Sequence, residues 1–235
     1  MNSSTFAPDR KLIIFDADDT LWENEPLFRE AEHRWADVLS GYGTREDRLA
    51  RLFNVEMGNI EELGYGVKSF IINMIEAAID ITGGSLSSEQ TGAIIKIGRS
   101  ILSNPATPMP GVAETLAEIR KRVSCPIVMY TKGELLDQNR KARRSGLVPL
   151  FDEVIVVSRK SEDSYTVLCR RFGIRPDELL SVGNSLKSDI GPVIALGGWG
   201  IHIPFHITWE HEKADPIDSP RLRTIASFPQ LLELL

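Results

Sequence analysis

The sequence predicts an α/β fold built on a doubly wound parallel sheet, with a helical domain inserted into it. Short, nearly continuous apolar runs end abruptly in small or polar residues, and helical patterns of suitable length separate them. Uninterrupted apolar runs are typical of strands buried on both faces, as in a parallel sheet. Strands that alternate with helices indicate a doubly wound sheet, whose ligand lies beyond the carboxyl ends of the strands.

The expected strands occur near the start of the sequence and throughout its second half. Their apolar runs cover residues 12–15, 127–130, 154–157, 179–182 and 201–203. Apolar stripes at helical spacing connect them over residues 112–122, 135–145 and 165–172. Gly173 follows the last of these helices, as expected of a helix end. Asp16, Thr131 and Asn184 fall at strand ends, so we expect them at one edge of the sheet.

Residues 22–104 break this alternation. They contain four helix-like segments and no convincing buried strand, and the segments are 26–39, 45–53, 67–79 and 88–101. Pro26 stands at a favoured first helical position, and glycine-containing breaks separate the segments. The sequence therefore predicts a core formed by residues 1–21 and 105–235, with residues 22–104 inserted as a helical domain after the first strand.

The composition is that of an ordinary globular chain and excludes several classes of protein. The 235 residues are 42% hydrophobic and 26% charged, with a net charge of −6. This balance excludes a disordered or fibrous chain and lacks the basic footprint of a nucleic-acid binder. No apolar run reaches the ~20 residues that span a bilayer, and residues 1–11 lack the apolar segment of a signal peptide. We expect a cytoplasmic protein with no nucleic-acid or membrane partner.

Acidic residues cluster immediately after the first expected strand. In the segment DADDT, Asp16 and Asp18 occupy alternate positions of an extended chain and so lie on the same side of it. One carboxylate can act as a nucleophile, and a second can act as general acid and then as general base. Such a cluster can also serve only to cap a turn or a helix. The spacing alone leaves both interpretations open.

Four segments in order resemble the haloacid dehalogenase (HAD) superfamily of phosphatases and phosphotransferases. They are FDADDTL at 15–21, IVMYT at 127–131, Lys160 ahead of a helix, and GNSLKSD at 183–189. Each motif alone is weak, but together they are specific, and the resemblance covers essentially the whole chain. It implies a Rossmann-like core with a helical cap of the C1 type, formed by the inserted residues.

The resemblance also implies an activity, a Mg²⁺-dependent phosphatase acting through an aspartyl-phosphate on Asp16. Asp18 would protonate the leaving alcohol and then activate a water molecule. Lys160 would neutralise charge on the transferred group, since phosphoryl transfer depends above all on positioning and charge stabilisation. The substrate would be a small phosphorylated metabolite, and the enzyme a monomer or homodimer.

The same resemblance implies the residues that bind substrate and metal. Thr131 would donate a hydrogen bond to a phosphoryl oxygen, and Lys132 and Gly133 beside it would complete the substrate-binding turn. Mg²⁺ prefers a few oxygen ligands together with water and substrate phosphate. The implied metal ligands are Asp16, Asp18, Asn184 and Asp189.

The chain departs from the family pattern at two positions. Asn184 stands where aspartate is usual, and the lost negative charge implies weaker Mg²⁺ binding or a larger role for Asp189. Asp19 replaces the usual glycine, and if that position needs a positive φ, aspartate is among the few residues that tolerate it. Asp18 argues against a dehalogenase, because the dehalogenases of the superfamily lack an aspartate there.

Alternatives to the phosphatase remain open at this stage. A phosphotransferase or a phosphonate-cleaving relative would use the same Asp16. A HAD-fold binding or regulatory protein with attenuated catalysis is the alternative that Asn184 raises. Substrate specificity would lie in loops of the cap, which carry no transferable motif.

Four weaker features each have an ordinary structural interpretation. The cap segment 64–68 could reach over the active site or form a surface turn. The region of His202, His206 and His211 lacks metal-site spacing, because Pro204 interrupts any helix there, so we expect a strand edge and a polar loop. The basic run 140–144 is expected to be a solvated helix end. The two cysteines, at 125 and 169, are expected to be buried and reduced.

Overall fold

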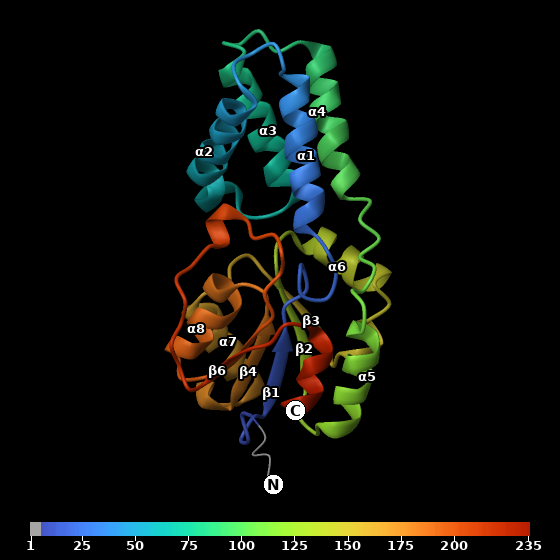
Figure 1. Cartoon of the computed structure of the whole chain (residues 1–235), viewed down its shortest axis with the longest axis vertical. Helices are drawn as coiled ribbons and strands as arrows, with labels where there is room; N and C mark the ends of the chain where they lie inside the picture. Colours follow the sequence, from blue (N-terminus) through green and yellow to red (C-terminus); the bar gives the residue numbers. More distant parts are fainter. Residues whose placement is uncertain (1–5) are drawn as a thin grey trace.

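The computed structural model describes residues 6–235, which form a parallel sheet covered by helices and a helical layer beyond one end of it (Figure 1). The strand order is β3-β2-β1-β4-β5-β6. The strands are β1 (Leu12–Phe15), β2 (Ile127–Lys132), β3 (Glu153–Val157), β4 (Leu179–Gly183), β5 (Trp199–His202) and β6 (Leu222–Thr224). This confirms the predicted doubly wound α/β fold. Residues 1–5, part of the stretch in which no signal peptide is expected, lie outside the described residues.

The strand order indicates where a ligand would bind, at the carboxyl ends of the central strands. β1 lies between β2 and β4, where the order of strands along the chain reverses, and all pairings there are parallel. The crevice beyond the carboxyl ends of strands at such a point is the usual ligand position in these folds. Phe15 at the end of β1 is in register with Met129 and Val182. The residues that follow these three therefore lie side by side.

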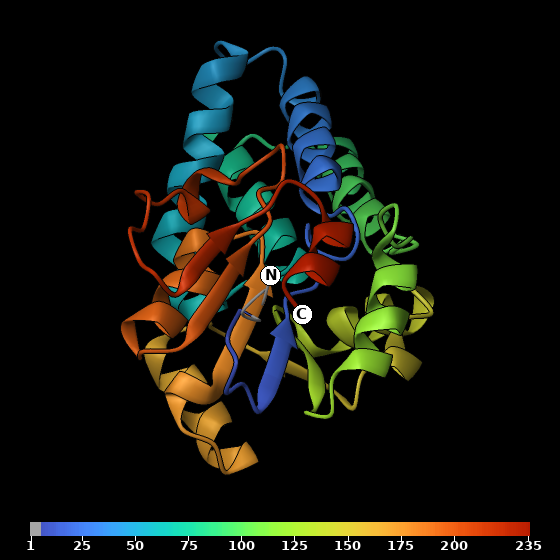
Figure 2. The same ribbon diagram turned by 60° about the horizontal axis from the view of Figure 1, so that its bottom comes forward.

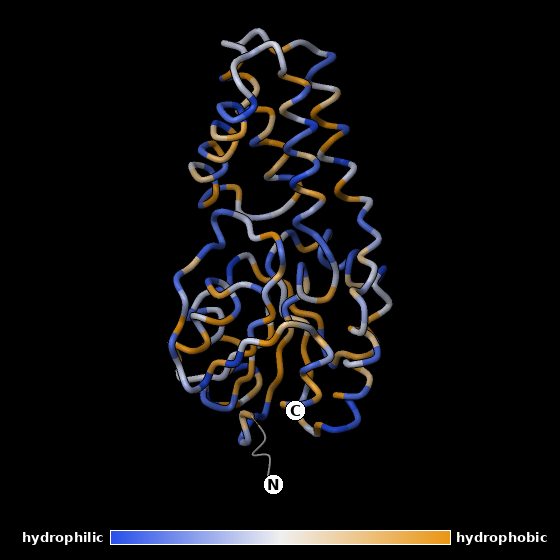
Figure 3. Tube along the Cα trace, viewed as in Figure 1, coloured by the Kyte–Doolittle hydropathy of each residue, from blue (hydrophilic) through white to orange (hydrophobic). Residues whose placement is uncertain are grey.

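Helices cover both faces of the sheet (Figure 2). They are α5 (Val112–Arg122), α6 (Leu135–Arg144), α7 (Glu162–Phe172) and α8 (Gly191–Ala195), with a π-helical turn at Leu186–Ile190 before α8. Alternate residues of β1 enter different apolar clusters: Ile13 packs in the cluster that contains Leu116 of α5, and Ile14 in the one that contains Leu168 of α7. Both faces of β1 are buried, which explains its uninterrupted apolar sequence (Figure 3).

The inserted segment forms a four-helix layer, the cap, at the top of Figure 1. Its helices are α1 (Glu25–Val38), α2 (Arg45–Leu63), α3 (Val67–Ile81) and α4 (Ser88–Ile101). Their apolar faces meet in a cluster of their own, in which the Trp35 indole donates to the Met74 carbonyl at 2.9 Å. Among the described residues, no helix is both long and apolar enough to cross a membrane.

The two connections between cap and core lie next to each other. Trp22 forms an antiparallel bridge with Pro108, and the Met109 amide donates to the Leu21 carbonyl at 2.9 Å. Trp22 itself is fully buried in an apolar cluster of the α/β core. The division of the chain into a core and an inserted segment at residues 22–104 stays a prediction. Trp22, the first residue of that segment, packs with the core.

Several elements differ in extent from those expected. β2 continues through Thr131 and Lys132, because these residues pair with β3. α2 extends to Leu63, well past the expected end at residue 53. The apolar pattern in the sequence stops early because the polar residue Glu56 occupies a buried position of the helix. β6 and the final turn, Phe228–Glu233, were not predicted, since β6 exposes most of its surface. Of the cysteines, the one at 169 is buried and the one at 125 only half-buried.

Two glycines of α4 test how closely the cap helices pack. A Cβ at Gly98 would overlap the Ile71 side chain of α3, whereas one at Gly92 would meet nothing within 4 Å. We expect Gly98→Ala to lower the free energy of unfolding by about 1–3 kcal/mol, because overpacking strains a close contact. Gly92→Ala should raise it by about 0.5–1 kcal/mol, because alanine favours the helix. Chemical denaturation measures both, and equal effects would contradict this packing.

Candidate active site

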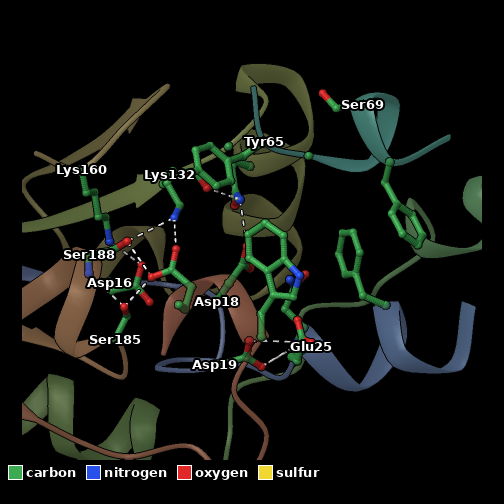
Figure 4. A pocket seen from close by; sticks show the side chains of 18 of the residues that line it. Asp16, Asp18, Asp19, Glu25, Tyr65, Ser69, Lys132, Lys160, Ser185 and Ser188 are labelled. Carbon is green, nitrogen blue, oxygen red and sulfur yellow. Dashed lines mark hydrogen bonds and ion pairs between the residues drawn. The ribbon is translucent and has the colours of Figure 1, made fainter. Parts of the chain in front are cut away.

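The carboxyl end of β1 delivers Asp16 to the edge of the sheet, where a buried lysine meets it (Figure 4). Lys160, which lies between β3 and α7, donates to Asp16 Oδ1 at 2.5 Å and to Asp189 Oδ1 at 2.7 Å. All three side chains are buried. Three motifs that are distant in sequence therefore converge on one ammonium group, as the sequence predicts for residues at strand ends.

Burial and the neighbouring carboxylates shift the pKa of Lys160 in opposite directions. Burial would lower the pKa of Lys160, but the carboxylates of Asp16 and Asp189 outweigh it and raise that pKa well above its ordinary value. Lys160 is therefore a permanent cation. Burial, together with the nearby Asp189, raises the pKa of Asp16 to about 7 against the lowering effect of Lys160. A further cation next to Asp16 would favour its ionised form.

Asp18 is held by a second lysine. Lys141 of α6 donates to both Asp18 oxygens, at 2.7 and 2.6 Å, and to Asn24 Oδ1 at 3.1 Å. The Gln138 amide donates to Asp18 Oδ2 at 2.8 Å, and the Trp22 indole donates to Oδ1 at 2.7 Å. The carboxyl of Asp18 is thus fixed in orientation by three donors from two elements.

The expected solvated helix end at residues 140–144 is wrong for Lys141. Its side chain is only 4% exposed, whereas Arg140, Arg143 and Arg144 of the same run are exposed. Lys141 lies one turn after Asp137, 3.8 Å from its carboxylate, and both face inward. A run of basic residues does not show which member faces inward. Lys141 follows Gln138 by three residues and Asp137 by four, so the three share one face of the helix, and this spacing was the signal that could have identified Lys141.

The residues after Asp18 order the turn that leaves β1. Asp19 has a φ of 62°, which confirms that an aspartate occupies a left-handed position here. Its carboxylate accepts from the Asn24 and Glu25 amides and so caps the start of α1. Thr20 Oγ1 lies 2.9 Å from Asp16 Oδ2 and 3.2 Å from Asn184 Oδ1. The side-chain oxygens of the two predicted metal ligands therefore converge on one hydroxyl.

This donor set fits Mg²⁺ in chemistry. Carboxylate and amide oxygens with a main-chain carbonyl are ligands that Mg²⁺ accepts. Both oxygens of Asp189 are already engaged, by Lys160 and by the Ser185 amide, so Asp189 is placed to orient other groups. Within residues 6–235, no three His, Cys, Asp or Glu side chains are grouped to hold a metal ion. The metal assignment therefore remains a prediction that rests on Asp16, Asn184 and the Asp18 carbonyl.

The predicted substrate-binding turn lies at the same edge. The Thr131 hydroxyl is buried and has no hydrogen-bond partner within the described chain, and Thr131 itself is not among the residues that line the cavity. Gly133 has a φ of +146°, and a Cβ there would overlap the Gln138 amide. Glycine is thus required at this position. Lys132 and Gly133 line the cavity described below.

A loop near the carboxyl terminus supplies a group that no motif revealed. Glu212 binds Lys132 Nζ at 2.5 Å and accepts from the Ser185 and Ser188 hydroxyls at 2.5 and 2.6 Å. Burial would raise the pKa of Glu212, but Lys132 and the Ser185 and Ser188 hydroxyls together outweigh it and lower that pKa to about 2. The short EHE segment has no periodicity, so no local pattern in the sequence indicates that Glu212 faces the site.

His202, His206 and His211 lie in different surroundings and have different contacts. His202 lies 2.9 Å from the Asn184 carbonyl, and His206 is exposed. His211 Nε2 lies 3.2 Å from the Tyr65 hydroxyl of the cap. One of these histidines therefore supports the loop of Asn184, and another contacts the cap.

The glycine-flanked cap loop lies over the site and is not a remote surface turn. Lys132 Nζ lies 4.0 Å from the centre of the Tyr65 ring, and Lys68 pairs with Glu134 of the core at 3.0 Å. Gly66 has a φ of +127° and sits against the Glu134 backbone, where a side chain would be crowded. Figure 4 shows Tyr65 beside Lys132 among the residues that line the pocket.

Cap and core together enclose a cavity of about 190 Å³. The core wall carries Asp16, Asp18 and Lys160, and the cap wall carries residues from α1, α2 and α3. A cavity closed on two sides suits a small substrate whose reacting group faces the core.

This fold and acidic strand end define a class of hydrolase. Residues 10–197, most of the chain, match the model of the haloacid dehalogenase-like hydrolases. The chain therefore belongs to the haloacid dehalogenase-like hydrolase family, which confirms the resemblance seen in its four motifs.

Three known proteins show how the chain relates to this family. A haloacid dehalogenase-like family hydrolase from Xanthomonas campestris superimposes with a TM-score of 0.85, at 34% identity over 99% of this chain and 93% of that one. The glyceraldehyde 3-phosphate phosphatase of Methanopyrus kandleri is 25% identical over 77% of this chain and 78% of its own. The 5-amino-6-(5-phospho-D-ribitylamino)uracil phosphatase of Escherichia coli is 23% identical over 92% of this chain and 94% of its own.

The pKa of Glu212 predicts an acid-dependent contribution to stability. Its value is about 2 in the fold, against an ordinary value of 4.5. A depressed pKa stabilises the fold above the unfolded value, and that stability is lost as the pH falls towards the folded value. When the pH falls from about 5 to about 3, we expect the free energy of unfolding of the wild type to decrease by about 2 kcal/mol more than that of Glu212→Gln.

Unfolding in urea at each pH measures this difference. Glu210→Gln is the matched control, because Glu210 lies in the same turn and is exposed, and it should lose stability as the wild type does. Identical pH dependence for the wild type and Glu212→Gln would contradict the ion pair with Lys132.

Proposed function

We propose that this enzyme is a Mg²⁺-dependent phosphatase that hydrolyses a small phosphorylated metabolite through an aspartyl-phosphate on Asp16. The observation that carries the proposal is the buried contact of Lys160 with Asp16 at the carboxyl end of the central strand. Family membership supports a hydrolase, and the two curated relatives described above are phosphatases of small metabolites by name. The enclosed cavity supports a small substrate rather than a phosphoprotein.

The proposed reaction has two steps that use the same residues. In the first, an Asp16 oxygen forms a bond to phosphorus as the bond to the leaving oxygen breaks, and Asp18, which enters this step in its protonated form, gives its proton to that oxygen. In the second, Asp18 takes a proton from water, which attacks phosphorus and releases phosphate from Asp16. Trp22, Gln138 and Lys141 keep the Asp18 carboxyl oriented through both steps.

The remaining groups stabilise charge on the transferred phosphoryl group. Lys160 stays cationic and lies against the nucleophile, and the unpartnered Thr131 hydroxyl at the end of β2 would donate to a phosphoryl oxygen. Mg²⁺, when bound by Asp16, Asn184 and the Asp18 carbonyl, would supply further positive charge to the phosphate. Such preorganised charges are the main means by which proteins accelerate phosphoryl transfer.

Removing the nucleophile tests the mechanism. We expect Asp16→Asn to reduce phosphate release by at least about 10³-fold, because the amide cannot form the phosphoenzyme. A panel of sugar phosphates, nucleotides and phosphoglycolate with Mg²⁺ measures this, and Asp163→Asn, an exposed change at the start of α7, should match the wild type. Phosphate release that survives in Asp16→Asn would contradict the mechanism.

The asparagine in the metal site gives a second prediction. We expect Asn184→Asp to lower the Mg²⁺ concentration for half-maximal activity by about tenfold, because a second carboxylate raises the charge of the ligand set. Asn54→Asp, which adds the same charge at an exposed position of α2, is the control and should not change it. Identical Mg²⁺ titrations for Asn184→Asp and the wild type would remove this explanation of the substitution.

A further inference from the structure

The cavity is divided by charge into two halves. The cations among its described lining residues are Lys132, Lys141 and Lys160, all of which belong to the core. Each already pairs with carboxylates of the core or the carboxyl-terminal loop. The cap wall carries three carboxyl groups, Glu25, Glu32 and Glu56, and its lining contributes no cation to neutralise them. A substrate whose phosphate meets Lys160 would present its leaving group to this acidic wall.

Glu56 is the most buried of these three acidic residues, and it lacks a partner within the described chain. Its residue is 9% exposed, it lines the cavity, and within the described chain it makes no hydrogen bond or ion pair. Burial raises its pKa to about 8, and the charges of Glu32 and Glu25 add to this. A buried carboxyl with no donor is costly, so it is expected to meet a donor when the cavity is filled.

The other two carboxyl groups repeat this pattern. Glu25 Oε1 is buried without a hydrogen bond within residues 6–235, and the contact of that atom with Arg29 is 3.5 Å long. Burial raises the pKa of Glu25 to about 7 and also raises the pKa of Glu32. All three side chains are acceptors when ionised, and a cation among them would lower the pKa of each. Figure 4 shows Glu25 across the pocket from Lys160.

Two observations indicate which kind of cation would fit. Among the described residues, Glu25, Glu32 and Glu56 are not grouped closely enough to hold a metal ion between them. Phe28 and Phe70 line the same part of the cavity with their ring centres 5.2 Å apart, and aromatic faces attract organic cations. Acceptors beside aromatic rings suit an ammonium group carried on a carbon skeleton.

We propose that the cap half of the cavity binds a protonated amine, so that the substrates are phosphate monoesters of amine-bearing alcohols. This inference rests on the proposed phosphatase function and names its substrate class. Glu56 binds the ammonium group, and Glu25 and Glu32 add negative charge around it. The same wall repels esters whose leaving group carries a carboxylate, because like charges would meet in a partly desolvated cavity.

Matched esters test this charge preference. 2-Aminoethyl, 2-hydroxyethyl and carboxymethyl phosphate differ only in their terminal group, and glucosamine 6-phosphate and glucose 6-phosphate form a larger pair. With the Mg²⁺-loaded wild-type enzyme, we expect kcat/KM for the amine to exceed that for the hydroxyl by at least about tenfold in one or both sizes. The carboxylate should be the poorest substrate. p-Nitrophenyl phosphate, which carries no amine, reports phosphatase activity independently of this preference.

Variants connect the preference to the cap wall. Glu56→Gln should reduce the amine-to-hydroxyl ratio of kcat/KM at least about threefold, and Glu32→Gln should shift it in the same direction. Glu62→Gln is the control, since Glu62 is exposed on the same helix and does not line the cavity. It should keep the wild-type ratio.

The outcomes separate this inference from the phosphatase function. A hydroxyl ester hydrolysed as well as its amine counterpart in both sizes would overturn the inference. So would carboxymethyl phosphate hydrolysed as well as 2-aminoethyl phosphate, or a wild-type ratio in both Glu56→Gln and Glu32→Gln. Hydrolysis of p-nitrophenyl phosphate in the same samples would leave the phosphatase function standing. If neither it nor any ester releases phosphate, the phosphatase function itself is wrong, and the substrate class falls with it.

Discussion

The arrangement of the whole site depends on one buried ammonium group. Lys160 joins the end of β1 to the segment after β4 through Asp16 and Asp189. All three side chains are buried, and removing one partner of a buried ion pair typically costs about 3–5 kcal/mol. Both the position of Asp16 and the course of the loop beyond β4 therefore follow from this one cation.

Charge balance around Lys160 explains why an acidic protein suits an anionic substrate. Two carboxylates surround one ammonium group, and the other two lysines of the cavity are neutralised by Asp18 and Glu212. The side chains of the site by themselves thus offer no surplus of positive charge to a phosphate dianion. A divalent cation at Asp16 would reverse that balance, which is the physical reason for expecting Mg²⁺ in the proposed reaction. The net charge of −6 is a property of the whole surface and does not describe this site.

How much the sequence could predict depended on how local the signal was. Of the four strands that end near the site, β1, β2 and β4 were recognised because burial on both faces leaves an uninterrupted apolar run, and the partly buried β3 carries a similar run. Asp16 and Lys160 were recognised because their motifs follow those strands. Lys141 and Glu212 were missed, because each owes its place to tertiary contacts that no local pattern encodes. Glu56 lay beyond the expected end of its helix for the same reason, since a polar residue facing inward imitates a helix end.

The adjacent crossings between cap and core have a consequence for how such a protein can be varied. Because Trp22 pairs with Pro108, the chain leaves the core for the cap and returns to it through two adjacent antiparallel segments. A helical domain of another size or shape could be grafted onto these two segments without moving any strand of the sheet. The chemistry and the choice of substrate are therefore encoded in separable modules, and recombination at one short junction can change the second while preserving the first.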